Sequence, residues 1–332
     1  MSVISTDITS ADKWEHIKCR ISGFRNSYLV EPGLYAVGSP GPESDVLVSA
    51  NYKLSFDHLR SSLKGMDVWV LVLDTKGVNV WCAAGKGTFS TSELTGRIRL
   101  SRLEGFVSHK RLIVPQLGAV GISAHEVKKA TGFRVHYGPV YASDIRNYIE
   151  AGYKAEPAMR RARFNLLDRL VLTPMEIVPA MKFFPKFALV ILLLFGLRPE
   201  GIIFLDALTG GMPFLVMGLM AVLSGALLTP ALLPYLPFRS FALKGYLTGL
   251  AATWIGTGLL PETVHWSVLC AAWIWFPLAS SYVALQFTGT TTFTGMSGVD
   301  KELRAGIPLY IGGTVVSVLL LIINTIVIWR AL

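Results

Sequence analysis

The distribution of apolar residues divides the chain into two halves of different character. Through residues 1–155, short apolar runs alternate with polar stretches of helical spacing, which is typical of an α/β domain. Beyond residue 175, the apolar runs approach the roughly 20 residues that a membrane-crossing helix needs. Residues 156–175 lie between the two patterns and carry several arginines. The sequence therefore predicts a folded domain at 1–155, a basic membrane-proximal connector at 156–175 and a transmembrane domain at 176–332.

The first half is expected to form a layered domain of strands and helices. Each apolar run is followed by a turn rich in glycine, asparagine or proline, so ligand-facing residues should gather at the C-terminal ends of the strands. The predicted strands are Val46–Ala50, Val68–Leu73, Leu112–Pro115 and Phe133–His136. The predicted helices are Ser55–Leu63, Val80–Ser90, Ser123–Thr131 and Ala142–Ala151.

The second half is expected to be entirely helical, with about five membrane-spanning helices. The candidate spans lie near Phe184–Leu197, Gly210–Leu228, Phe241–Leu260, Trp266–Phe287 and Pro308–Trp329. Gly245 and Gly249 form a Gly-x-x-x-Gly pair, which favours close packing between helices. Basic residues are more frequent in the loops on one side, where they are Arg239, Lys244, Lys301 and Arg304, than on the other, where they are Arg198 and Arg330. By the positive-inside rule, the richer side and the N-terminal domain are cytoplasmic, as in a multi-pass protein of the inner membrane.

The composition supports a membrane protein of a reducing compartment. The hydrophobic fraction is 52% and the mean hydropathy is +0.49, which is too apolar for a soluble domain alone. The segment Met1–Lys18 is polar and of mixed charge, so no signal peptide is expected at this end. The three cysteines form no spaced framework. The net charge of +9 is scattered and accompanies no nucleic-acid-binding motif, so no nucleic-acid partner is predicted.

One run of residues carries the chemistry of the chain. Asn79–Lys86 follows a predicted strand and a short turn, and Asn79 is a good N-cap for the amides of Trp81 or Cys82. Cys82 would then lie in the first helical turn, where the helix dipole favours a thiolate. The small residues Ala83, Ala84 and Gly85 remove bulk beside it. The pattern indicates a soft metal bound to a broad, flat ligand.

Other interpretations of Cys82 start from simpler roles. A lone cysteine in an apolar setting is most often a packing residue. A phosphate-binding loop fails, because the first glycine of its motif would fall on Val80 and Gly87 follows Lys86 where serine or threonine is needed. A zinc site is disfavoured, since no Cys-x-x-Cys pair exists. A cysteine–histidine nucleophile stays open, with the candidate histidines His109, His125 and His136.

The octapeptide Asn79–Lys86, with its flanks Val72–Gly77 and Gly87–Phe89, resembles the signature of the mercury-methylating corrinoid proteins. These are the membrane partners in a two-protein system of anaerobic microbes. Further blocks also resemble that family, namely Pro32–Gly38, Ala50–Asp57, Ile113–Ala119 and Tyr137–Val140. The N-terminal half is similar to the corrinoid-binding domain of the corrinoid iron–sulfur protein. The resemblance implies a Rossmann-like α/β corrinoid-binding domain followed by an all-α transmembrane domain.

The resemblance further implies a corrinoid, cobalamin or a related compound, with the Cys82 thiolate as lower axial ligand of cobalt. The alternative histidine-ligand motif Asp-x-His-x-x-Gly is absent, because none of the six histidines has an aspartate two residues before it. A thiolate donates electrons more strongly than imidazole and favours methyl release as a carbanion or a radical, which suits electrophilic Hg(II). Lys86 would either face a corrin amide or be a solvated lysine. The implied cofactor-binding residues are Thr75, Asn79, Val80, Trp81, Cys82, Ala83, Ala84, Gly85, Lys86, Gln116, Leu117, Gly118, Tyr137 and Gly138.

The implied partners follow from this chemistry. Cobalt must be reduced between turnovers, and the family uses a ferredoxin-like protein with two 4Fe–4S clusters, while a methyl-folate system is the expected methyl donor. The leading interpretation is a membrane-anchored methyltransferase that forms methylmercury. A membrane-tethered methyl carrier of one-carbon metabolism with another acceptor is the main alternative. A transport protein with a regulatory soluble domain is a third, and it predicts no bound cobalt.

Overall fold

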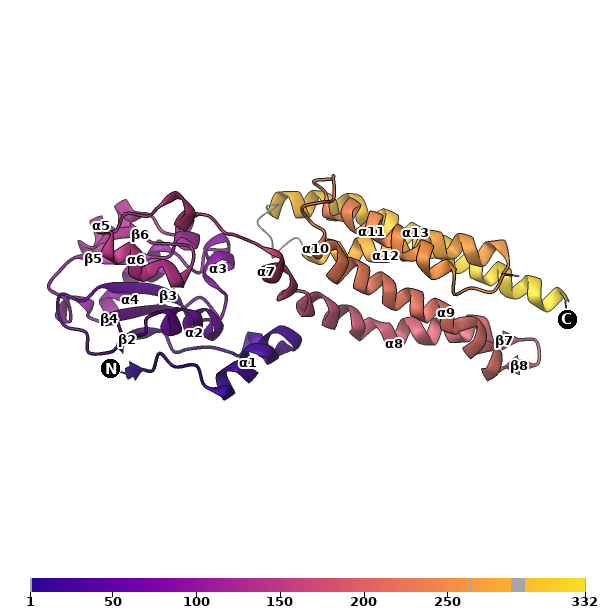
Figure 1. The fold of residues 1–332 in the computed structure, drawn as a ribbon, viewed down its shortest axis with the longest axis horizontal. Coiled ribbons are helices and arrows are strands. Elements are labelled where there is room, and N and C mark those ends of the chain that lie inside the picture. Colours follow the sequence, from indigo (N-terminus) through magenta and orange to yellow (C-terminus); the bar gives the residue numbers. More distant parts are fainter. Residues whose placement is uncertain (1, 263, 288–295, 332) are drawn as a thin grey trace. The chain divides into compact units, whose positions relative to one another are not determined.

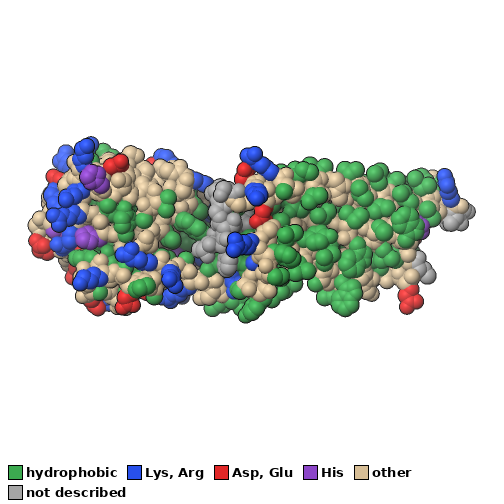
Figure 2. Space-filling model, turned by 90° about the horizontal axis from the view of Figure 1, so that it is seen from above, with side chains coloured by type: hydrophobic (Ala, Val, Ile, Leu, Met, Phe, Trp, Pro, Cys, Tyr) green, Lys and Arg blue, Asp and Glu red, His purple; other side chains and the backbone are tan. Residues whose placement is uncertain are grey.

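The chain folds as two compact units, Met1–Arg163 and Phe164–Leu332. The computed structural model describes residues 2–262, 264–287 and 296–331. Each unit has its own hydrophobic core. Figure 2 shows one face of the molecule, on which hydrophobic side chains cover the helices of the second unit and charged side chains are concentrated on the first.

The first unit is built on a mixed β-sheet. Among the described residues its strand order is β1-β2-β4-β3-β5-β6. The four strands β3 to β6 run parallel, whereas β2 pairs antiparallel with β4, and β1 lies parallel to β2. The strands are β1 Ser2–Ile4, β2 Gly33–Val37, β3 Val46–Ala50, β4 Val68–Leu73, β5 Arg111–Val114 and β6 Arg134–Tyr137 (Figure 1).

Helices pack on both faces of this sheet. Capping side chains mark where several of them begin: Thr9 caps α1, Asn79 caps α3, Ser90 caps α4 and Ser123 caps α5. The α-helices of the first unit are α1 Ser10–Ile21, α2 Lys53–Ser62, α3 Val80–Lys86, α4 Thr91–Leu100, α5 Ala124–Thr131 and α6 Ile145–Glu150. Short 3-10 turns are η1 Gly23–Asn26, η2 Leu103–Gly105, η3 Gln116–Gly118, η4 Ala142–Asp144 and η5 Pro157–Arg160.

Strand β4 is central in the sheet and is buried on both faces, and this explains why its sequence is continuously apolar. Trp69, Leu71 and Leu73 belong to the core cluster that includes residues of α3, α4 and α5. Val68, Val70 and Val72 belong to the opposite cluster, with residues of α2 and α6. Because side chains alternate between the two faces of a strand, burial on both faces requires an unbroken apolar run.

Most predicted elements of the first unit are present, with differences at their ends. Strands β3 and β4 have the predicted bounds, and β5 and β6 differ from the predicted bounds by one residue at each end. The helix predicted to reach Ser90 ends at Lys86, because Gly87 adopts a left-handed conformation with φ 78°. Ser90 instead caps α4, a helix that the prediction did not contain. Strands β1 and β2 and helix α1 were also not predicted.

The second unit is a bundle of long helices. Its elements are α7 Leu166–Leu170, α8 Pro174–Gly196, β7 Leu197–Arg198, β8 Gly201–Ile202, α9 Phe204–Leu223, a π-helical segment η6 Ser224–Leu228, α10 Thr229–Ala231, α11 Phe241–Thr257, α12 Trp266–Gln286 and α13 Met296–Ala331. Within the described residues, four helical segments are long and apolar enough to cross a membrane: Leu166–Gly196, Phe204–Ala231, Trp266–Gln286 and Gly298–Arg330.

Helix α11 corresponds to one of the about five predicted membrane spans, but it is too short to be one. It has 17 residues, which corresponds to about 25 Å at 1.5 Å per residue and falls short of a hydrocarbon core of about 30 Å. It packs closely on α12 through the predicted glycine pair. A Cβ atom on Gly245 would lie 2.3 Å from Ala284 Cβ, and one on Gly249 would lie 2.7 Å from Ser280 Cβ. The expectation of close helix packing at this pair is therefore confirmed.

Candidate functional site

The site is built where the four parallel strands end. The C-terminal ends of β3, β4, β5 and β6 lie along one edge of the sheet, as parallel pairing requires. The loop after β4 leads into α3, and the loop after β5 forms η3, which contacts α3. The loops after β5 and β6 are joined by a hydrogen bond from the Gln116 backbone N–H to the Pro139 carbonyl oxygen (3.4 Å). Segments far apart in the sequence therefore meet around α3.

Asn79 fixes the start of α3 and the position of Cys82. Asn79 has extended backbone angles, and its Oδ1 accepts a hydrogen bond from the Cys82 backbone N–H at 2.9 Å. This is the N-cap that the sequence predicts. Cys82 is the third residue of the helix, is partly exposed and forms no disulfide. Cys82 is therefore a partly exposed residue held at a capped helix start.

Asn51 holds the loop that precedes α3, a role that the sequence analysis missed. Its buried Oδ1 accepts hydrogen bonds from the Thr75 backbone N–H (3.0 Å), the Thr75 hydroxyl (2.8 Å) and the Gly77 backbone N–H (3.0 Å). The loop turns through Gly77 with φ 70°, and a Cβ there would lie 2.3 Å from Leu29 Cδ2. Asn51 lies in Ala50–Asp57, one of the sequence blocks that resemble the family, and that resemblance is the signal that could have identified its role.

The small residues of α3 serve two different purposes. Ala83 and Ala84 are buried in the core cluster beneath the helix. Gly85 is exposed, and a Cβ added to it would meet no atom within 4 Å. The two alanines let the helix approach the sheet, and the expectation that the three small residues leave room for a broad, flat ligand against the helix stays a prediction. Trp81 and Lys86 are exposed on the outer side of α3.

The loop after β5 places an unpaired polar atom beside α3. Gln116 Oε1 is buried and has no hydrogen-bond partner among the described residues. The neighbouring Gly118 is required by close packing, because a Cβ there would lie 2.4 Å from the Phe89 ring. Phe89 is fully buried and follows α3, so it locks η3 against that helix. A buried amide oxygen without a donor is a natural contact point for a ligand N–H.

Several other predicted residues have structural partners. The Thr75 hydroxyl is buried and has the Val78 carbonyl oxygen, 2.7 Å away, as a second acceptor for its one proton. The Tyr137 hydroxyl donates to the Ile122 carbonyl oxygen at 2.7 Å. Gly138 is buried, and a Cβ on it would lie 2.8 Å from Ile113 Cγ2. These residues shape the sheet edge from within, while Val80 and Leu117 are partly exposed on it.

The histidines proposed as partners of Cys82 have other contacts. His109 Nε2 lies 2.9 Å from the Ser44 carbonyl oxygen. His136 packs against the Tyr153 ring, and burial lowers the pKa of its imidazole. His125 is exposed on α5. In the part of the chain that the structure describes, no group of three or more histidine, cysteine, aspartate or glutamate residues is placed to hold a metal ion.

The comparisons with known proteins concern the first unit. The gamma subunit of the acetyl-CoA decarbonylase/synthase complex from Archaeoglobus fulgidus is 32% identical over 131 residues, which are 39% of this chain and 27% of that protein. The same subunit from Methanopyrus kandleri is 31% identical over 135 residues, or 40% of this chain and 29% of that protein. The chain thus spans less than a third of the length of these relatives. The model of the CO dehydrogenase/acetyl-CoA synthase delta subunit family matches residues 22–149, so the N-terminal α/β domain is similar to that family.

Proposed function

We propose that the first unit binds a corrinoid and that the chain is a membrane-anchored, corrinoid-dependent methyltransferase. The delta-subunit family that matches residues 22–149 binds a corrinoid cofactor. The observation that carries the proposal for this chain is the position of Cys82, a partly exposed residue at a helix start capped by Asn79. That helix stands at the C-terminal edge of the sheet, where ligands of open α/β folds bind.

The residues around α3 fit a corrinoid. The macrocycle is broad and flat and carries amide side chains that donate hydrogen bonds. Gly85 offers open space above α3, and the buried Gln116 Oε1 atom offers an acceptor that no described residue satisfies. Cys82 offers one soft ligand for a metal whose other ligands belong to the macrocycle.

When bound, a corrinoid supplies a cobalt centre that carries a methyl group. Cys82 would be the protein residue that holds this metal, through a soft sulfur ligand. Asn79 orients the helix turn on which Cys82 stands, and Asn51 holds the loop from which that turn begins. Such supporting contacts fix a ligand's direction and tune its donor strength.

The methyl acceptor that we favour is Hg(II), giving methylmercury. The support is the match of Asn79–Lys86 to the mercury-methylating signature together with the donor strength of a thiolate ligand, which suits an electrophilic acceptor. A ferredoxin-like protein with two 4Fe–4S clusters is proposed as the electron donor and a methyl-folate system as the methyl source. A methyl carrier of one-carbon metabolism is the second candidate, because the relatives are subunits of acetyl-CoA decarbonylase/synthase complexes.

The second unit is proposed to anchor the protein in the inner membrane. Four of its helical segments, within the described residues, have the length and composition of membrane spans. Arg239 precedes α11, and Lys301 and Arg304 lie near the start of α13; these basic residues favour a cytoplasmic first unit by the positive-inside rule.

The test compares Cys82→Ala with the matched control Cys270→Ala in the purified full-length protein. Cys270 is an exposed free cysteine on α12. Both variants should fold, since removing one small side chain costs on the order of 1 kcal/mol. Cys82→Ala should change the optical spectrum of the bound corrinoid and abolish methyl transfer to Hg(II), whereas Cys270→Ala should do neither.

The outcomes separate the candidates. Near-normal methylmercury formation by Cys82→Ala would refute the axial-ligand role. Retained cobalt in the unchanged protein with methyl transfer only to a non-mercury acceptor would favour the carrier function. Absence of retained cobalt after gel filtration would refute both.

A further inference from the structure

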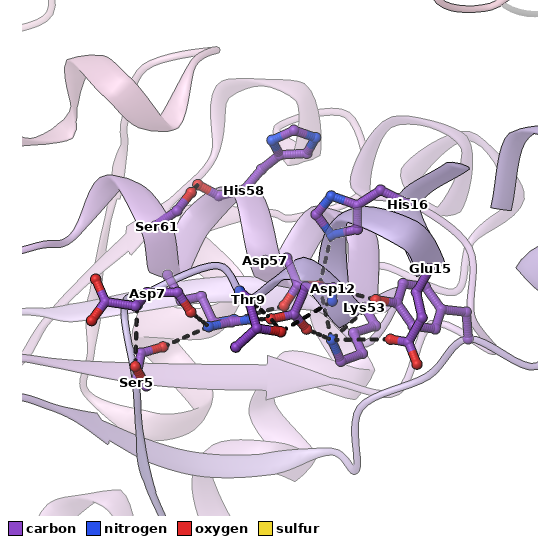
Figure 3. Close-up of polar contacts among 12 residues, drawn as sticks. Ser5, Asp7, Thr9, Asp12, Glu15, His16, Lys53, Asp57, His58 and Ser61 are labelled. Carbon is purple, nitrogen blue, oxygen red and sulfur yellow. Dashed lines mark hydrogen bonds and ion pairs between the residues drawn. The ribbon is translucent and has the colours of Figure 1, made fainter. Parts of the chain in front are cut away.

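Helix α1 has the reverse of the usual amphipathic arrangement. Its inward side carries Asp12 and His16, which point toward Lys53 and Asp57 of α2 (Figure 3). Cys19 is the one residue of α1 that is fully buried. A surface helix normally turns its apolar side to the core and its polar side to water. In α1 the polar side faces the domain.

An ion-pair network holds α1 in this orientation. Asp57 is wholly buried and accepts hydrogen bonds from Arg60 (2.6 Å) and Lys53 (2.9 Å), and its Oδ2 lies 2.9 Å from His16 Nε2. Asp12 of α1 pairs with the same two cations, at 2.9 Å from each. Arg60 also donates to two backbone carbonyls of the arm before α1, those of Ser5 and Asp7. The network therefore ties the whole N-terminal arm to α2.

Charge balance keeps this network ionised. Burial alone would raise the pKa values of Asp12 and Asp57, but hydrogen bonds from Lys53 and Arg60, with His16 for Asp57, outweigh it and hold both pKa values below the ordinary range. Turning α1 outward would remove Asp12 from Lys53 and Arg60 and His16 from Asp57, and breaking such partly buried ion pairs is costly. The orientation of α1 is fixed as a consequence.

The outward side of α1 is apolar with basic neighbours. Trp14, Ile17 and Ile21, which we call the α1 outer face, are spaced three and four residues apart and remain 55%, 48% and 42% exposed. Lys18 Nζ lies 5.9 Å from the centroids of the Trp14 and Phe24 rings. Lys13 and Arg25 are also exposed nearby in the sequence. Single exposed apolar residues are ordinary, whereas a continuous helical stripe with a tryptophan calls for a partner.

We propose that the α1 outer face binds the headgroup region of an anionic lipid bilayer. The second unit of the same chain carries helices suited to crossing a membrane, so lipid is available wherever the protein resides. Tryptophan and isoleucine on one side with lysine and arginine beside them is the chemistry of helices that lie in a membrane interface. The basic residues match anionic headgroups, which attract lysine and arginine close to the surface. This inference does not depend on the cofactor or on the methyl acceptor.

The experiment uses the full-length protein in nanodiscs containing phosphatidylglycerol. The photo-crosslinking residue p-benzoylphenylalanine replaces Ile17 in one sample and Val120 in the matched control. Val120 is 86% exposed and lies between η3 and α5 of the same unit. After illumination, intact-protein mass spectrometry should find lipid adducts at position 17 and essentially none at position 120.

A second arm tests the charge contribution. Lys13→Glu with Lys18→Glu should reduce lipid adducts at position 17 several-fold, and nanodiscs of phosphatidylcholine alone should give a similar reduction. Helical circular dichroism and exchange protection of α2 report whether these variants still fold. Equal adduct yields at positions 17 and 120 would overturn the proposal. Crosslinks at position 17 to an added iron–sulfur protein, without lipid adducts, would also overturn the proposal in favour of a protein partner.

Discussion

Replacement of Asn51 by alanine should loosen the loop before α3 without unfolding the first unit. Asn51 Oδ1 is the shared acceptor for the backbone N–H groups of Thr75 and Gly77 and for the Thr75 hydroxyl. The hydroxyl keeps a second acceptor, the Val78 carbonyl oxygen. The two backbone donors lose theirs, and Asn51 and Thr75 are too deeply buried for easy access by water.

The size of the effect follows from these two donors. The Thr75 N–H is buried and costs roughly 1–3 kcal/mol when left without a partner, whereas the Gly77 N–H is only partly buried and water can replace its acceptor, so the free energy of opening this loop should fall by roughly 1–3 kcal/mol. Because about 1.4 kcal/mol corresponds to a factor of ten, amide exchange in the loop should accelerate by at least about fivefold. The N-cap at Asn79 would move with the loop, and corrinoid retention should fall with it.

Hydrogen–deuterium exchange of the full-length protein in nanodiscs measures this directly. Peptides that cover the β4–α3 loop should lose protection in Asn51→Ala, while peptides from α5 should not change. The matched control is Asn147→Ala, because Asn147 is exposed on α6. Wild-type exchange rates at Thr75 and Gly77 in Asn51→Ala would show that the loop is held by other contacts, and the argument for Asn51 as its organiser would fail.

Two further predictions concern α3 and the N-terminal arm. Gly85→Ala should leave the fold intact or stabilise α3 by up to about 1 kcal/mol, because the added methyl meets open space and alanine is the better helix former. The same substitution should weaken corrinoid retention if the cofactor lies against Gly85. Unchanged retention, measured by cobalt content, would place the cofactor elsewhere. The folded pKa values of Asp12 and Asp57 are lowered from an ordinary value of 3.8, so the stability that they contribute is complete above that value and is lost as the pH falls below it. Exchange protection in α1 should therefore decline below about pH 4, and Asp57→Asn should cause a loss of about 3–5 kcal/mol already at neutral pH; protection that stays constant down to pH 2 would contradict the ion-pair account.

The parts of the fold that could be predicted from sequence are those specified by local patterns. Strands β3 and β4 are buried on both faces, so their apolar runs have sharp limits. Asn79 predicted the start of α3 correctly, because the N-cap hydrogen bond joins residues only three positions apart in the sequence. The long helices of the second unit followed from composition and length.

The parts that could not be predicted depend on contacts between distant segments. Asn51 acts across 24 residues of sequence on Thr75, and nothing near Asn51 shows that β3 and β4 are neighbours. Helix α1 presents its apolar residues outward, so its pattern does not indicate a core-facing helix. The burial of Ala83 and Ala84 toward the sheet depends on how α3 lies, and the packing of α3 against β4 and Phe89 determines this.

The polar contact between α1 and α2 has a thermal consequence. Unfolding of the two apolar clusters exposes hydrocarbon and raises the heat capacity, so their contribution to stability weakens on cooling. Detachment of α1 exposes mainly charged and polar groups, since Cys19 is its one fully buried residue, and exposed polar surface lowers the heat capacity instead. The attachment of α1 should therefore vary little with temperature, and it should persist in the cold under conditions in which the packing of the sheet has already begun to weaken.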